Sequence, residues 1–148
     1  MTGHRVYLVR HAKAEDRRED DGSRRLTPQG RARFERLLHA LADRLALVRI
    51  VTSPLLRARE TAELLARASR APIEEDPRLG CGASGGRDLL SLARQAAPGT
   101  ALVGHNPELA EAVALAAGKD VEVPPGAVAA LDVRARDVTL AWLEVPGR

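Results

Sequence analysis

Two histidines and two arginines of this sequence follow short apolar segments, at places where the side chains of one site could gather. Arg10 and His11 come directly after the residues VYLV, and His105 comes directly after ALVG. Arg57 lies shortly past a third apolar segment, VRIVT. Guanidinium groups stay charged and repel cations, so this set suits an anion better than a divalent metal. Forked, charge-assisted hydrogen bonds from arginine favour phosphate as that anion.

A phosphate bound beside a histidine indicates covalent catalysis. A neutral imidazole nitrogen can attack phosphorus while arginines neutralise the phosphoryl oxygens. A carboxylic acid is then needed to protonate the leaving group and later to activate water. The acidic stretch that follows His11 offers Glu15, Asp16, Glu19, Asp20 and Asp21. The glycine motifs of nucleotide sites are missing from the sequence, so no cofactor is predicted.

The elements that must position these residues alternate between strand and helix patterns. Strands are predicted at 6–9, 48–54 and 100–107, and helices at 26–45, 55–69, 87–97 and 108–118. Two further strands, 126–135 and 138–145, are predicted to form a hairpin at a sheet edge. The alternation predicts an α/β fold, a three-layer sandwich with a mainly parallel central sheet flanked by helices. Ligands of such sheets bind at the carboxyl ends of the strands, so we expect the three strand ends to share one site.

Proline follows a potential capping residue near three of the predicted helix starts. Thr27, Ser53 and Asn106 each precede a proline and are predicted to be N-caps. Helix N-termini at Pro54 and Pro107 would add partial positive charge at the same edge of the sheet. The stretch 13–25 is so rich in charge that we expect it not to pack.

Composition narrows the class of protein. The chain has 148 residues, 45% of them hydrophobic, which suits a single domain spanning 1–148. The net charge is only +3 and aromatic residues make up 2%, so nucleic-acid binding is not expected. No apolar run approaches the roughly 18–20 residues that span a bilayer, so no membrane association is expected. The single cysteine, Cys81, excludes an intramolecular disulfide, and a cytoplasmic location is predicted.

Three motifs taken together resemble a known family. The segments LVRHA, SPLLRARETAE and LVGHNP, in this order, are similar to those of the histidine phosphatase superfamily, whose fold is phosphoglycerate mutase-like. The short chain and the segment RRLTPQG make it most similar to the SixA-type phosphohistidine phosphatase branch. The resemblance covers about residues 5–118.

The resemblance implies a role for each matching residue. His11 would be the nucleophile that becomes phosphorylated, and Arg10 and Arg57 would bind the phosphoryl oxygens. His105 would polarise the phosphoryl group. Arg24, in the segment that resembles R-x-L-T, would also reach the phosphate.

Two further residues are candidates for roles at the site. Asp21, three residues before Arg24, is the preferred proton donor among the five carboxylates after His11. Asn106 is a candidate phosphate ligand as well as a predicted cap. The chain departs from the family at Ala12, where many members have glycine, and at Arg25, where the branch often has proline.

These inferences predict a metal-independent phosphatase that works through a phosphohistidine intermediate. The preferred substrate is a phosphorylated histidine on a signalling or carrier protein. The alternatives are a small-molecule phosphomonoesterase with the same machinery and a phosphoprotein-binding module without turnover. The sequence does not indicate an oligomeric state.

Overall fold

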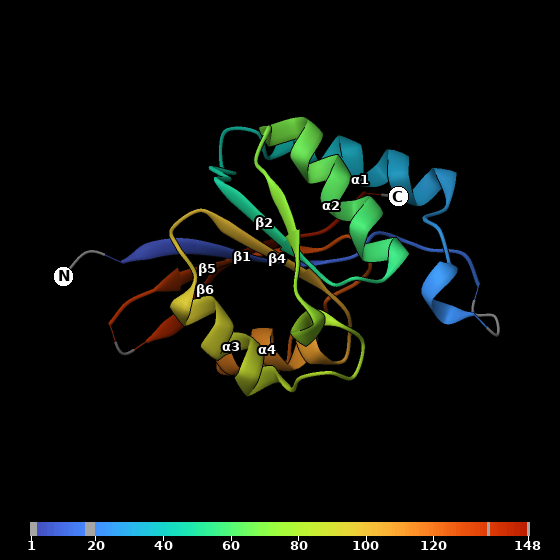
Figure 1. Ribbon diagram of the computed structural model, residues 1–148. Coiled ribbons are helices and arrows are strands. Elements are labelled where there is room, and N and C mark those ends of the chain that lie inside the picture. Colours follow the sequence, from blue (N-terminus) through green and yellow to red (C-terminus); the bar gives the residue numbers. More distant parts are fainter. Residues whose placement is uncertain (1–2, 17–19, 136, 148) are drawn as a thin grey trace.

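The described part of the chain, residues 3–16, 20–135 and 137–147 of a computed structural model, contains one sheet of six strands (Figure 1). The strands are β1 (His4–Arg10), β2 (Arg49–Thr52), β3 (Ile73–Glu75), β4 (Thr100–Gly104), β5 (Val128–Val133) and β6 (Val138–Glu144). Their order across the sheet is β3-β2-β4-β1-β5-β6. The first four strands in this order run parallel, whereas β5 and β6 pair antiparallel. The predicted mainly parallel sheet with a hairpin at its edge is confirmed, and β3 extends the opposite edge.

Helices cover both faces of the sheet, as Figure 1 shows. α1 (Pro28–Ala40) and α2 (Leu56–Ser69) lie on one face, and α3 (Gly86–Gln95) and α4 (Glu108–Ala117) lie on the other. Two short 3-10 helices, η1 (Asp21–Ser23) and η2 (Pro77–Leu79), lie in connections. In the described residues, no helix combines the length and the apolar character needed to cross a membrane. The three layers confirm the predicted α/β sandwich.

The end of α1 differs from the prediction. The apolar periodicity continues to Leu45, but the helix ends at Ala40 and the chain passes through a turn. The Arg44 carbonyl in this turn accepts a hydrogen bond of 3.0 Å from the Tyr7 hydroxyl. The last apolar residues of this pattern therefore lie in and after the turn and not in the helix, because the chain has to return to the sheet at β2.

Alternate side chains of β1 enter the two halves of the core. Tyr7 and Val9 belong to the cluster beneath α1 and α2. Val6 and Leu8 belong to the cluster beneath α3 and α4. This alternation is the two-residue period of a strand that is buried on both faces, which explains the uninterrupted apolar run in the sequence.

The register of the parallel strands brings the predicted strand ends together. Arg10, the last residue of β1, pairs with Gly104, the last residue of β4. One residue further on, the His11 N–H donates to the Gly104 carbonyl over 3.1 Å. On the other side of β4, the Ser53 N–H donates to the Val103 carbonyl over 2.9 Å. The chain therefore leaves β1, β2 and β4 at one edge of the sheet, as predicted.

The charged stretch 13–25 is held more firmly than we predicted. Its two ends meet in an antiparallel bridge between Ala14 and Leu26. The Glu15 N–H donates to the Arg25 carbonyl over 2.8 Å, and Leu26 is buried. The prediction that this stretch does not pack is wrong at its ends, because backbone pairing there is independent of side-chain charge.

Candidate active site

The two predicted histidines face each other across the ends of β1 and β4. The ring centroids of His11 and His105 are 5.2 Å apart, and the ring planes are inclined by 53°. His11 is 8% exposed and His105 is 2% exposed. Their proximity follows from the pairing of Arg10 with Gly104, since each histidine is the next residue along its own chain segment.

A single hydrogen bond fixes the tautomer of His11. Its Nδ1 lies 2.7 Å from the Ala12 carbonyl oxygen. A carbonyl oxygen can only accept, so Nδ1 carries the proton and donates. In the neutral ring Nε2 then keeps its lone pair and can serve as a nucleophile.

The surroundings of His11 keep the ring neutral. Burial has the largest effect on the pKa of His11, and the positive charges of Arg57, Arg10 and Arg24 act in the same direction, while the hydrogen bond to Ala12 raises the pKa. Together these effects lower it from 6.5 to about 4. At neutral pH the imidazole is therefore uncharged, as a nitrogen nucleophile must be.

Arg10 and Asn106 converge on the same backbone carbonyl. Arg10 Nη1 donates to the Val123 oxygen over 3.0 Å, and Asn106 Nδ2 donates to it over 2.9 Å. Arg10 Nε is buried and has no hydrogen-bond partner among the described residues, so it can donate to an anion. The Asn106 oxygen accepts from the Ala110 N–H over 3.2 Å. The N-cap position of α4 is Pro107, so the prediction that Asn106 is the N-cap is wrong, although its side chain binds the first turn from one residue earlier. The contact of Asn106 with phosphate stays a prediction.

Arg57 lies in the first turn of α2 and is only 2% exposed. One turn later, Thr61 Oγ1 donates to the Arg57 carbonyl over 2.8 Å and accepts from the Ala12 N–H over 3.0 Å. The start of α2 therefore holds both Arg57 and the residue that follows His11. The Ala12 methyl group, where many family members have glycine, is buried in the core beneath α1 and α2.

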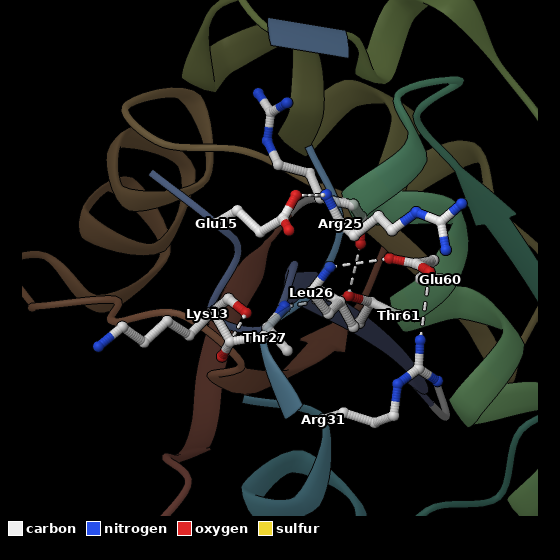
Figure 2. Close-up of polar contacts among 10 residues, drawn as sticks. Lys13, Glu15, Arg25, Leu26, Thr27, Arg31, Glu60 and Thr61 are labelled. Carbon is white, nitrogen blue, oxygen red and sulfur yellow. Dashed lines mark hydrogen bonds and ion pairs between the residues drawn. The ribbon is translucent and has the colours of Figure 1, made fainter. Parts of the chain in front are cut away.

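Arg24 belongs to the same cluster although it lies in a connection. Its Nη1 donates to the Glu15 carbonyl over 2.9 Å, and its charge is one of those that lower the pKa of His11. The Arg25 N–H donates to Glu15 Oε1 over 3.0 Å (Figure 2). Proline, which the related branch often has at position 25, could not make this hydrogen bond because it lacks the N–H.

The five candidate proton donors differ in their exposure and in how much of each the structure describes. Glu19 lies outside the described residues, and of Asp21 only the backbone, in η1, is described. Asp16 and Asp20 are exposed. Glu15 is half-buried, and one of its carboxylate oxygens accepts from Arg25 N. The assignment of Asp21 as the acid stays a prediction.

Ser53 has a different place from the one predicted. The helix after β2 begins at Leu56, so Ser53 is not its N-cap. Instead Ser53 Oγ lies 2.8 Å from His105 Nε2 and accepts from the Leu55 N–H over 3.2 Å. The sequence marked Ser53 as a cap because it precedes a proline, and its contact with His105 was not predicted.

Together these groups can bind a tetrahedral anion and attack it. One neutral imidazole nitrogen lies among three guanidinium groups, with a second imidazole beside it. Residues 3–16, 20–135 and 137–147 contain no group of three or more His, Cys, Asp or Glu side chains that could hold a metal ion. Cationic side chains are the groups that stabilise charge on a transferring phosphoryl group.

Sequence and structure comparisons agree with this chemistry. Residues 6–80 match the family model of the histidine phosphatase superfamily (branch 1). An uncharacterized protein of Picosynechococcus sp. is 42% identical over 126 residues, covering 77% of this chain and 74% of the relative. The crystal structure of SixA from Agrobacterium tumefaciens, assigned as a phosphohistidine phosphatase, is 29% identical with a TM-score of 0.81, covering 97% of this chain and 99% of that one. The protein histidine phosphatase SixA complexed with tungstate has a similar fold, with 22% identity, a TM-score of 0.82 and coverage of 96% and 97%.

The chain therefore belongs to branch 1 of the histidine phosphatase superfamily, and its fold is that of the SixA-type members. Membership makes it a phosphatase, a hydrolase that acts on phosphorylated substrates. The resemblance seen in the three sequence motifs is confirmed. The family match covers Arg10, His11 and Arg57, whereas His105 lies beyond it and is placed at the site by the fold.

Proposed function

We propose that this phosphatase works through a covalent phosphohistidine at His11 and acts on a phosphorylated histidine of another protein. The observation that carries the proposal is the buried, neutral imidazole of His11, with Nδ1 bound to Ala12 and three arginines around the ring. Catalysis needs no metal in this proposal, because the guanidinium groups supply the positive charge. A cytoplasmic location and a role in signalling stay expectations from the sequence.

In the first step, His11 Nε2 attacks phosphorus and a new N–P bond forms. The bond between phosphorus and the donor nitrogen breaks, and its electron pair goes to that nitrogen, so the donor ring leaves neutral with a proton on its other nitrogen. Arg10, Arg57 and Arg24 neutralise the phosphoryl oxygens, and His105 polarises the group. In the second step, water attacks phosphorus and gives a proton to the ionised carboxylate of the acid. The N–P bond breaks, its electron pair returns to Nε2, and phosphate leaves.

The leaving group distinguishes the proposed substrate from a small ester. When a phosphohistidine donates, an N–P bond breaks as another forms, so the two sides of the transfer have similar energies. The second nitrogen of the donor imidazole can carry a proton, so the ring leaves as a neutral molecule. An alkyl ester has no such nitrogen and depends on the enzyme's acid. The named activities of the SixA proteins that share this fold support the same choice.

The first experiment compares phosphate release from a phosphohistidine protein and from alkyl phosphomonoesters, with EDTA present throughout. We expect wild type to turn over the protein substrate. His11→Ala should reduce its rate by a factor on the order of 10⁴ or more, because the nucleophile is removed. His39→Ala is the matched control, since His39 lies exposed on α1, away from the site, and should retain the wild-type rate.

Each other outcome has a definite meaning. Turnover of small esters alone would assign the protein to the phosphomonoesterases. A phosphoenzyme that forms and never hydrolyses would favour a phosphoprotein-binding module. Full activity of His11→Ala would contradict the covalent mechanism, and loss of activity in EDTA would contradict metal independence.

A further inference from the structure

The segment that carries Arg24 belongs to no helix or strand, so its position needs a separate explanation. The bridge between Ala14 and Leu26 and the bond from Thr27 N to the Lys13 carbonyl, 2.9 Å long, join the two ends of the loop to each other. The bond from Arg24 to the Glu15 carbonyl also stays within the loop. These contacts shape the loop, but they do not fix it against α2, which carries Arg57.

Glu60 of α2 makes that connection. Glu60 Oε1 accepts from the Leu26 N–H over 2.8 Å, and Oε2 binds Arg31 Nη2 over 3.2 Å (Figure 2). The Glu60 side chain is only 14% exposed. One carboxylate therefore links α2 to the backbone two residues after Arg24 and to the first turns of α1.

The spacing along α2 gives this link its significance. Glu60 lies three residues after Arg57, so the two side chains are one helical turn apart. Thr61 in the same turn binds the Ala12 N–H, next to His11. The first two turns of α2 therefore carry Arg57 itself. They also bind the backbone beside His11 through Thr61 and the segment of Arg24 through Glu60.

We propose that Glu60 is a positioning residue, which sets the place of Arg24 relative to His11 by holding the Leu26 N–H. This role rests on the proposed function, because it takes Arg24 to be a phosphate ligand. Glu60 itself stays outside the reacting groups and acts through Arg24. The hydrogen bond to Leu26 carries the effect, and the ion pair with Arg31 orients the carboxylate.

A double-mutant cycle separates positioning from simple stabilisation. Tungstate serves as a tetrahedral oxyanion probe, and its dissociation constant is measured by calorimetry for wild type, Glu60→Met, Arg24→Ala and the double variant. Arg24→Ala is expected to weaken binding roughly 10–100-fold, the typical cost of one charged hydrogen bond. Glu60→Met should weaken tungstate binding roughly tenfold when Arg24 is present. In the Arg24→Ala background it should weaken binding less than about twofold, because Glu60 acts through the contact of Arg24 with the anion.

Three further variants test the assignment. Glu63→Met removes the same charge from an exposed position one turn further along α2, so it controls for the change in net charge and should bind tungstate like wild type. Glu60→Gln keeps an oxygen that can accept from Leu26 and is expected to restore most of the affinity. Arg31→Met removes only the ion pair, and we expect an effect smaller than that of Glu60→Met.

The possible results are distinct. If Glu60→Met weakens binding equally with and without Arg24, Glu60 does not act through Arg24 and the inference is overturned. It is also overturned if Arg24→Ala binds tungstate as wild type does. If Glu60→Met does not fold, the cycle is run with Glu60→Ala. An enzyme that binds tungstate with the expected coupling but hydrolyses no phosphohistidine would refute the proposed function and leave the positioning role in place.

Discussion

Burial and positive charge act in the same direction on the His11 imidazole. Both disfavour a protonated ring, and together they outweigh the hydrogen bond to Ala12, which raises the pKa. The arginines that would bind phosphate thus also keep the nucleophile in its reactive form when the site is empty. The same effect makes the stability of the folded protein depend on pH.

The sign of this dependence follows from the two states of His11. Its pKa is about 4 in the folded protein and 6.5 in the unfolded chain. Between these values the unfolded chain binds more protons, so folding stability falls as the pH decreases from about 6.5 to about 4 and then levels off. The full contribution is on the order of 3 kcal/mol, at about 1.4 kcal/mol for each pKa unit.

Urea unfolding of wild type and His11→Gln at several pH values between 4 and 7 tests this prediction. The variant should lose less free energy of unfolding than wild type over this interval, because it lacks the group that gains a proton on unfolding. His39→Gln, which removes an exposed histidine of α1, provides the comparison. Parallel curves for wild type and His11→Gln would show that the folded site does not resist protonation of His11.

At the residue scale, the sequence predicts some site positions and not others. Arg10, His11 and His105 could be placed because each lies at or directly after the end of a strand, and parallel strands end at one sheet edge. Arg24 came only from the family resemblance, since its loop position has no periodic signal. Glu60 looked like an ordinary helix residue, because its partner is the N–H of Leu26, and backbone groups leave no mark in a sequence.

At the element scale, α1 depends on a close approach to the stretch after His11. Gly30 in its first turn is buried, and the Thr27 N-cap binds the Gly30 N–H over 2.9 Å, as predicted. A methyl group at Gly30 would overlap the Lys13 carbonyl oxygen and lie 2.9 Å from Lys13 Cβ. That carbonyl accepts from the Thr27 N–H, so it is not free to move away.

Gly30→Ala should therefore destabilise the protein by about 1–3 kcal/mol, as overpacking of a filled site does. Helix propensity alone would predict the opposite, because alanine is favoured over glycine by about 1 kcal/mol in a helix. Gln29→Ala, at an exposed position of the same helix, isolates the propensity effect and should leave stability within about 0.5 kcal/mol of wild type. Chemical denaturation of wild type, Gly30→Ala and Gln29→Ala measures whether the free energy of unfolding rises or falls. A stabilised Gly30→Ala would contradict the close packing.

The elements were more predictable than their ends. Apolar patterns placed the four α-helices and five of the six strands that the structure describes, because burial against a sheet imposes a period on the sequence. β3 (Ile73–Glu75) is exposed throughout and has no apolar pattern, so it was not among the predicted strands. The backbone pairing of Ala14 with Leu26 was missed because charged neighbours surround it.

At the scale of the whole molecule, the site exists only when distant segments are in place. His11 follows β1, Arg24 lies in the next connection, Arg57 starts α2 and His105 follows β4. None of these groups can bind an anion together with the others in the unfolded chain. An oxyanion ligand should therefore stabilise the entire fold, since it binds the folded state alone.

The gain in stability can be stated in advance from the affinity. At a tungstate concentration of 100 times the dissociation constant, the free energy of unfolding of wild type should rise by about 2.7 kcal/mol. Arg57→Ala, which removes one buried guanidinium, should show much less of this rise at the same concentration. Urea titrations with sodium chloride at matched ionic strength control for screening. An equal rise in both proteins would mean that tungstate binds elsewhere on the surface. Binding at a site formed by Arg10, Arg57 and His11 must weaken when Arg57 is removed, so the rise must then be smaller in the variant.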